Sequence, residues 1–243
     1  MAPSKDEAVK RRAALVTGGS TGIGLCIARV LGEEGYQVTL VARGKDRKLD
    51  DAVTQLRKLG IDAAAAAGDL QVEADVGQVV EAHRQRCGRL DVLVNSAGVL
   101  ALGPVQQHST TELDALIGVN LRAMVLMYRE CFPLLTAAGV EHRTALVINL
   151  ASLVGRHAEP FAGAYSATKF AVVGFTQAMR AELAPYGIRS CALCPGRVAT
   201  ASNAHLAAEQ SLIPLTDVAE VVRLLLRLSP HARIPEICIE EAS

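Results

Sequence analysis

The chain has 243 residues, half of them hydrophobic, with 25 lysines and arginines against 25 aspartates and glutamates. This length and hydrophobic content are ample for one large core. The net charge of zero gives no electrostatic reason to expect nucleic acid or an anionic membrane as a partner. No linker, repeat or low-complexity tract interrupts the sequence, so we expect a single domain over residues 13–243 behind a polar N-terminal tail of residues 1–12.

The apolar segments are too short for a signal peptide or a membrane-spanning helix. The run after Arg12 covers only Ala13–Val16, and no stretch approaches the roughly 20 apolar residues that a spanning helix needs. The six cysteines are expected to be free thiols. Cys191 and Cys194 have redox or metal-ligand spacing, but in a strand such positions face opposite ways. We therefore expect a soluble cytoplasmic protein without a metal site.

Short apolar segments alternate along the chain with segments of helical periodicity. The predicted strands are residues 13–17, 36–41, 61–67, 90–95, 145–150, 189–194 and 236–240. The predicted helices are residues 24–34, 49–59, 76–83, 111–135, 164–184 and 217–228. Five consecutive alanines in 61–67 favour a helix by propensity. The segment lies between Gly60 and Gly68 and is too short for a helix in this pattern, so we predict a strand.

The alternation of strands and helices indicates the fold class. Strands that alternate with helices of ten or more residues indicate βαβ units and a parallel sheet. Strands that are apolar on both faces fit a sheet covered on both sides. We predict an α/β fold with a doubly wound, Rossmann-like sheet in three layers, α/β/α. Ligands bind beyond the carboxyl ends of such strands, and Thr17-Gly18, Arg43, Asn95, Ser152 and Pro195-Gly196 each follow a predicted strand end.

A glycine-rich segment, Thr17-Gly-Gly-Ser-Thr-Gly22-Ile-Gly24, follows the first predicted strand. Its glycines permit a tight turn and the approach of a pyrophosphate to a helix N-terminus. The spacing G-x-x-x-G-x-G differs from the commoner G-x-G-x-x-G, and an ordinary strand-to-helix turn is the alternative. The position in the first βαβ unit favours a dinucleotide. The candidate cofactor-binding residues here are Gly18, Ser20, Thr21, Gly22, Ile23 and Gly24.

The end of the second predicted strand bears on the choice of cofactor. An acidic residue there would bind the ribose 2′-hydroxyl of NAD, and none is present. Arg43 instead offers a guanidinium suited to a 2′-phosphate, and Ser20 and Lys45 are expected to assist it. A solvated surface arginine is the alternative. The sequence therefore favours NADP(H) over NAD(H).

The third and fourth strand ends add further candidates. The carboxylate of Asp69 is expected to accept from an adenine amino group, and Leu70 to pack on the ring. Asn95 is expected to tie neighbouring loops together. The small residues Ala97 and Gly98 leave room for a cofactor.

Tyr165 and Lys169 are four residues apart in a predicted helix, and Ser152 lies thirteen residues upstream of the tyrosine. Positions i and i+4 share one helix face, and a neighbouring cation lowers the pKa of a phenol. Such a tyrosine exchanges a proton with a substrate oxygen near neutral pH. Ser152 would donate a hydrogen bond to that oxygen. A half-buried tyrosine beside a solvated lysine is the alternative.

Together these motifs resemble the short-chain dehydrogenase/reductase family, from residue 13 to about residue 239. The matching motifs are Thr17-Gly-x-x-x-Gly-x-Gly24, Asn95-x-Ala-Gly98, Asn120, Ser152, Tyr165-x-x-x-Lys169 and Pro195-Gly196. The resemblance implies that Tyr165 is the general acid/base and that Lys169 lowers its pKa and holds the nicotinamide ribose. It also implies that Ser152 orients the substrate oxygen. Asn120 would anchor a water beside Lys169. The segment expected to contact the nicotinamide comprises Pro195, Gly196, Val198 and Thr200.

The implied activity is that of an NADP(H)-dependent oxidoreductase, with hydride transfer between nicotinamide and a small carbonyl or alcohol coupled to proton transfer at Tyr165. One alternative is a reductase of 3-oxoacyl groups on an acyl carrier protein, which needs a basic patch. Arg156 and Arg197 are candidates for it. Another is a non-catalytic NADP-binding protein. The resemblance also implies a homodimer or homotetramer that pairs through helices 111–135 and 164–184.

Three loops are expected to wall the substrate pocket: residues 99–102, 153–161 and 200–213. The second contains Arg156, His157 and Glu159, which either meet an acidic substrate or are solvated. The third is either a mobile lid or a surface helix.

Overall fold

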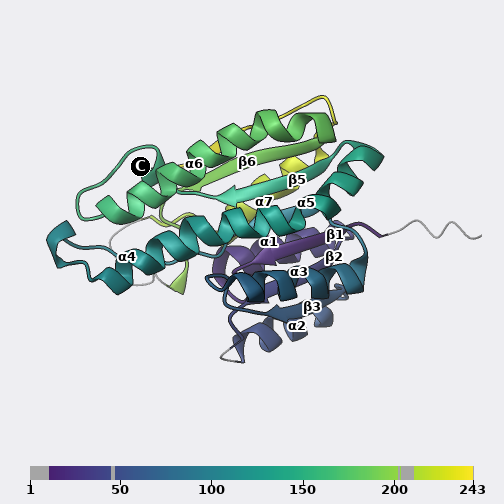
Figure 1. Cartoon of the computed structure of the whole chain (residues 1–243), viewed down its shortest axis with the longest axis horizontal. Coiled ribbons are helices and arrows are strands. Elements are labelled where there is room, and N and C mark those ends of the chain that lie inside the picture. The colour runs from purple at the N-terminus through teal and green to yellow at the C-terminus, as the bar shows by residue number, and fades with distance from the viewer. Residues whose placement is uncertain (1–10, 45–46, 202, 204–210, 243) are drawn as a thin grey trace, which may run out of the picture.

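The computed structural model describes residues 11–44, 47–201, 203 and 211–242. Its centre is a parallel sheet of seven strands in the order β3-β2-β1-β4-β5-β6-β7, which confirms the predicted doubly wound fold (Figure 1). The strands are β1 (Ala13–Thr17), β2 (Gln37–Ala42), β3 (Ala63–Ala67), β4 (Val92–Asn95), β5 (Ala145–Leu150), β6 (Ile188–Pro195) and β7 (Glu236–Ile239).

Helices connect each strand to the next. They are α1 (Gly22–Glu33), α2 (Lys48–Lys58), α3 (Glu73–Cys87), α4 (Thr110–Ile117), α5 (Ala123–His142), α6 (Gly163–Leu183) and α7 (Leu215–Arg227). Short 3-10 turns cover Val105–Gln107 (η1), Leu153–Gly155 (η3) and Ala184–Tyr186 (η4).

Two apolar clusters lie on opposite faces of the sheet. Val16 of β1 packs in the cluster that includes α1, α2 and α7, whereas the adjacent Leu15 packs in the cluster of α3, α5 and α6. Both side chains are fully buried. This alternation produces the three predicted layers, with helices covering the sheet in Figure 1.

The alanine-rich segment forms a strand, as predicted. The whole of β3 pairs with β2, from Ala63 beside Val38 to Ala67 beside Ala42. Ala63 and Ala66 are buried, so tertiary pairing outweighs the helical propensity of alanine.

The predicted helix 111–135 is extended and includes a wider turn. A π-helical turn, η2 (Gly118–Arg122), separates α4 from α5, and α5 continues to His142. The turn buries Asn120, and single π turns of this kind are frequent at functional sites. The predicted long helical stretch is confirmed as a continuous helical run, and the wider turn within it aims the Asn120 side chain at the segment after β4.

The continuous helical run Thr110–His142 is long and apolar enough to cross a membrane by length and composition, which corrects the expectation that no segment qualifies. Half of its most apolar window is buried inside the protein. Met127, Cys131 and Leu135 are fully buried in the cluster with α3 and α6. The composition reflects packing on the sheet, as in a core helix.

The N-terminal tail was expected to cover residues 1–12. Residues 1–10 lie outside the described part of the chain. Arg12 belongs to the fold, because its carbonyl oxygen accepts a hydrogen bond of 2.9 Å from Gln37 N–H.

Candidate active site

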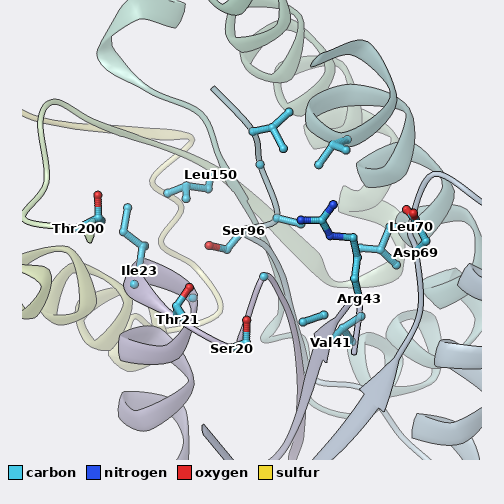
Figure 2. Close-up of a pocket in the computed structure, with 18 of the residues that line it drawn as sticks. Ser20, Thr21, Ile23, Val41, Arg43, Asp69, Leu70, Ser96, Leu150 and Thr200 are labelled. Atoms are coloured by element: carbon cyan, nitrogen blue, oxygen red, sulfur yellow. The ribbon is translucent and has the colours of Figure 1, made fainter. Parts of the chain in front are cut away.

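A cavity of about 380 Å³ lies at the carboxyl ends of β1 to β5. Figure 2 shows its two ends: Arg43, Asp69 and Leu70 lie on one side, and Ile23 and Thr200 lie on the other. We call this cavity the cofactor cleft. Twelve of the predicted cofactor residues line it: Gly18, Ser20, Thr21, Gly22, Ile23, Gly24, Arg43, Asp69, Leu70, Ala97, Gly98 and Thr200.

Two glycines of the β1–α1 turn lie too close to neighbouring backbone atoms to carry a side chain. Gly18 has a φ of +64°, and a Cβ there would lie 2.9 Å from the backbone of Ala97. A Cβ on Gly24 would overlap the carbonyl oxygen of Gly18. These contacts hold the β1–α1 turn against the segment after β4 and leave the start of α1 open to the cleft.

Arg43 is exposed at the end of the cleft where we expect the adenosine of the cofactor. It has no ion pair among the described residues. The neighbouring Asp69 is partly used within its own loop, where its carboxylate accepts from Gln71 N–H at 3.1 Å. Lys45 lies outside the described residues. The guanidinium of Arg43 thus has the freedom that a phosphate-binding group needs.

The structure brings Ser152, Tyr165 and Lys169 together beyond the end of β5 and at the start of α6. Ser152 lies close enough to Tyr165 to influence its pKa, and its hydroxyl donates to Pro195 O at 3.3 Å. Lys169 Nζ lies 5.6 Å from the Tyr165 ring centroid. The ammonium donates to the carbonyl oxygen of Leu150 at 2.8 Å. Leu150 lines the cofactor cleft, whereas Tyr165 lines a second cavity. The pair therefore lies between the two cavities.

The predicted lowering of the Tyr165 pKa is not found in the protein without a cofactor. Burial raises the pKa of Tyr165 to about 12, and the influence of Ser152 acts in the opposite direction. Burial also lowers the pKa of Lys169 to about 8. The prediction of a lowered tyrosine pKa is wrong here because sequence spacing does not show burial, and the ammonium is engaged by Leu150.

Asn120 connects the π turn to the segment after β4. Its Oδ1 accepts from Val99 N–H at 2.8 Å, and its Nδ2 donates to Val99 O at 2.9 Å and to Thr168 Oγ1 at 3.2 Å. Thr168 precedes Lys169 on α6. Asn120 therefore positions both the cleft wall and the helix that carries the lysine, and its role toward a water stays a prediction.

A chain of buried polar groups crosses the sheet below the cleft. Asn95 Nδ2 donates to Asn149 Oδ1 at 2.9 Å, and Asn149 donates to Thr176 at 2.9 Å. Thr17 Oγ1 accepts from Ser96 N–H at 3.0 Å and Ala97 N–H at 3.1 Å. Asn95 was expected to tie neighbouring loops together, but its side chain joins β4 to β5, and Thr17 instead holds the loop after β4. The buried Oδ1 of Asn95 has no partner in the described residues.

A second cavity of about 190 Å³ adjoins Ser152 and Tyr165, and we call it the substrate pocket. Apolar side chains from two of the three predicted loops line it, including Leu100, Leu102 and Leu153. From the third loop, Asn203 lines it, whereas residues 202 and 204–210 lie outside the described residues, so the lid prediction does too. Of the predicted nicotinamide segment, Gly196 lines this pocket, while Pro195 ends β6 and the buried Val198 pairs with Ile213.

Glu241 is a pocket residue that the sequence analysis missed. It follows β7, and its carboxylate accepts from Arg197 N–H at 2.5 Å. The Arg197 guanidinium lies 3.6 Å from Glu159 and 3.8 Å from Glu241. Arg156 is paired with Glu236 at 2.9 Å. The two arginines expected to form a basic patch are therefore each compensated by carboxylates.

Three comparisons relate the chain to known proteins. A putative ketoacyl reductase of the monensin polyketide synthase from Streptomyces virginiae is 42% identical over 191 residues, covering 78% of this chain and 71% of that protein. A metagenomic short-chain oxidoreductase solved with NADP is 32% identical, with a TM-score of 0.82 and coverage of 96% and 98%. The 3-ketoacyl-(acyl-carrier-protein) reductase from Brucella melitensis, solved with NADH, is 28% identical, with a TM-score of 0.86 and coverage of 94% and 96%.

The short chain dehydrogenase family profile matches residues 12–211, which span β1 to the segment after β6. The matched region contains the glycine-rich turn, the π turn at Asn120 and the group of Ser152, Tyr165 and Lys169. With the parallel sheet and the cleft at its carboxyl edge, this match shows that the chain is an oxidoreductase of the short-chain dehydrogenase family.

Proposed function

We propose that the protein is an NADP(H)-dependent oxidoreductase that interconverts a small carbonyl compound and its alcohol. The observation that carries this proposal is the position of Tyr165 and Lys169 between the cofactor cleft and the substrate pocket. A substrate oxygen beside Ser152 and Tyr165 would face a nicotinamide held in the neighbouring cleft. Bound cofactor supplies the hydride chemistry.

The protein's own groups supply orientation and the proton. At neutral pH the phenol of Tyr165 is protonated, because burial raises its pKa to about 12. It therefore starts as a proton donor to a carbonyl oxygen, which suits the reduction direction. Ser152 donates a second hydrogen bond to that oxygen, and Lys169 stays fixed by Leu150 O at the boundary with the cleft. Oxidation of an alcohol would require the phenol to lose its proton first.

Arg43 supports the preference for NADP(H). It is exposed at the Asp69 end of the cleft without an ion-pair partner among the described residues, so a 2′-phosphate would meet an uncompensated guanidinium. We expect Arg43→Ala to weaken NADPH binding by about 10- to 100-fold, because a charge-assisted pair is lost. NADH binding should change far less. Isothermal titration measures both, with Arg47→Ala as the control, and equal losses for the two cofactors would refute the role of Arg43.

The pocket charges support an uncharged substrate. Arg197 is flanked by Glu159 and Glu241, so these three side chains together carry one excess negative charge. An anionic substrate would meet this charge, whereas a neutral ketone of modest size fits the leucine-lined walls of a cavity of about 190 Å³. We infer that neutral carbonyl compounds are preferred over the corresponding carboxylic acids.

A second candidate is reduction of 3-oxoacyl groups on an acyl carrier protein. Resemblance to a putative ketoacyl reductase at 42% identity favours it. Pairing of Arg156 and Arg197 with carboxylates opposes it, because an acidic carrier needs free cations. Reduction of acetoacetyl-carrier protein at least tenfold more efficiently than a free acetoacetyl thioester would establish this alternative.

A panel of carbonyls and alcohols, followed by nicotinamide absorbance, tests the proposed activity. The panel pairs each neutral keto ester with its keto acid. We expect NADPH-dependent reduction of the esters and little reduction of the acids. Tight NADPH binding without turnover of any compound would instead indicate a non-catalytic NADP-binding protein.

We further propose a homodimer or homotetramer in the cytoplasm. Leu113 and Ile117 of α4 and Phe170 of α6 are exposed apolar side chains on neighbouring helices, which supports a subunit contact there. All six cysteines are free, as expected in a reducing compartment. Light scattering of the purified protein tests the assembly, and a monomer at micromolar concentration would refute it.

A further inference from the structure

Cys194 and Cys238 form a thiol pair that their distance in the sequence conceals. They are direct partners in the parallel pairing of β6 with β7. Side chains of register partners project from the same face of a sheet. Cys191, three residues before Cys194, packs instead against the opposite face, in the cluster with α1 and α7. The thiol that lies beside Cys194 is therefore that of Cys238 on β7.

The geometry of the pair suits a covalent bond. Neighbouring strands lie about 4.8 Å apart, which is within the roughly 4.4–6.8 Å between Cα atoms that a disulfide spans. The two Sγ atoms lie within 4.8 Å of each other. Cys194 is buried and Cys238 is exposed, so one thiol of the pair is open to a reagent.

The surroundings assign different roles to the two sulfurs. Burial raises the pKa of both thiols, and that of Cys194 reaches about 12. Burial and the carboxylate of Glu236 raise the pKa of Cys238, and the smaller effects of Cys194 and Arg156 act in the opposite direction. Exposure therefore decides the order: Cys238 is open to a reagent, and the buried Cys194 is placed to displace a group from it.

The third donor of this cluster, Glu236, does not favour a metal ion. Its Oε1 accepts from Arg156 Nε at 2.9 Å and lies 3.7 Å from Cys238 Sγ. A divalent cation bound by this carboxylate and the two thiolates would face the guanidinium of Arg156 at close range. A covalent bond between the two sulfurs leaves the ion pair of Arg156 and Glu236 intact.

We propose that Cys194 and Cys238 form a dithiol site that is oxidised by a low-molecular-weight disulfide to an intrachain disulfide between β6 and β7. The Cys238 thiolate attacks one sulfur of the reagent, forming a mixed disulfide and releasing one thiolate. The Cys194 thiolate then attacks the Cys238 sulfur and releases the second. Two electrons pass from the cysteines to the reagent, and the two thiol protons end on the two released thiols.

The bond would join two segments that form one wall of the substrate pocket. Cys194 is followed by Pro195 and Gly196, and Glu241 lies three residues after Cys238. The Glu241 carboxylate already accepts from Arg197 N–H. Oxidation therefore reaches the pocket through strand ends without involving Tyr165 or Lys169, and the site stands independently of the proposed activity.

Peptide mass mapping tests the site directly. The reduced full-length protein is incubated with oxidised glutathione, alkylated and digested without reductant. We expect a linked peptide of Cys194 and Cys238 in monomer-sized chains, with a mass about 2 Da below that of the two thiol peptides. Alkylation of both cysteines, or a Cys238–Cys238 bond between two chains, would overturn the proposal.

Three variants separate the steps. Cys194→Ser should accumulate a glutathione adduct on Cys238, because the second step is lost; Cys194→Ala serves if the serine variant does not fold. Cys238→Ser should leave Cys194 reduced, and Cys87→Ser should not affect the crosslink. Adduct formation at Cys194 in the Cys238→Ser protein would contradict the assigned order. Protection of both thiols from alkylation by one equivalent of Zn²⁺ would show a metal site instead.

Discussion

The carboxyl and amino ends of the parallel sheet differ in how their buried polar groups are satisfied. At the carboxyl end, glycines hold an open cleft, Asn95 Oδ1 is buried without a partner, and Lys169 is buried with a lowered pKa. At the amino end, the ion pairs and hydrogen bonds around Asp91 compensate one another, although Arg189 Nε is also buried without a partner in the described residues. Several polar groups at the carboxyl end remain available for a ligand, whereas those around Asp91 are bound within the protein. This difference separates residues of function from residues of stability.

Asp91 is the centre of the amino end. It immediately precedes β4 and accepts from Arg89 at 2.6 Å, from Ala13 N–H at 2.7 Å and is paired with His142 at 2.7 Å. Burial alone would raise the pKa of Asp91, yet these hydrogen bonds lower it below its usual value of 3.8. The network joins the starts of β1 and β4 to the end of α5.

The largest expected effect is at the carboxyl end. Tyr165→Phe removes the proton donor, so turnover should fall by about 10²- to 10⁴-fold. Binding of NADPH and the free energy of unfolding should change little, because the ring remains in place. Steady-state kinetics and calorimetry measure the two effects. Turnover within threefold of the native enzyme would remove Tyr165 from the mechanism.

At the amino end we expect the reverse pattern. Asp91→Asn should lower the free energy of unfolding by about 3–5 kcal/mol at pH 7, because it removes the buried charge partner of Arg89 and leaves only the exposed Glu141. kcat of the folded enzyme should be retained. Urea denaturation at several pH values checks this.

The pH dependence has a definite sign. Because the folded-state pKa of Asp91 lies below its usual value, its stabilisation is complete above about pH 4 and is lost as the pH falls further. The difference between native protein and variant should therefore shrink in acid. A difference that grew below pH 4 would contradict the network's role.

A pair of glycine substitutions gives the smallest effects and sharpens the contrast. Gly24→Ala should destabilise the protein by about 1–3 kcal/mol and weaken NADPH binding, because its Cβ overlaps Gly18 O. Gly77→Ala in α3 meets no atom within 4 Å and should stabilise by about 0.5–1 kcal/mol. Thermal melts with and without NADPH measure both, and similar effects at the two sites would remove the close approach as an explanation.

The carboxyl end was largely predictable from the sequence because its motifs are local. Gly18, Gly22 and Gly24 lie within one strand–turn–helix segment, and Tyr165 and Lys169 lie on one helix turn. Alternating apolar segments likewise predicted every strand of the sheet, including the alanine-rich β3.

The remaining features depend on neighbours that are distant in the chain. Glu241 enters the pocket because β7 pairs with β6, and the Asp91 network requires β4 to lie between β1 and β5. The π turn at Asn120 depends on the segment after β4. The pKa of Tyr165 was predicted in the wrong direction because burial is a property of the folded protein.

Functional residues at the carboxyl end of the sheet are held in place at the expense of the stability of the folded protein. Lys169 tests this, since burial lowers its pKa from 10.5 to about 8. The folded chain binds this proton more weakly than the unfolded chain does, so the cost is complete below pH 8 and disappears as the pH rises toward 10.5.

The most direct measurement is the free energy of unfolding of Lys169→Met against the native protein between pH 7 and 10.5. Each unit of pKa shift corresponds to about 1.4 kcal/mol, and the variant loses the hydrogen bond to Leu150 O. We predict that Lys169→Met is inactive but more stable by roughly 2 kcal/mol at pH 7, with the gain vanishing near pH 10. A variant less stable than the native protein at pH 7 would contradict the account.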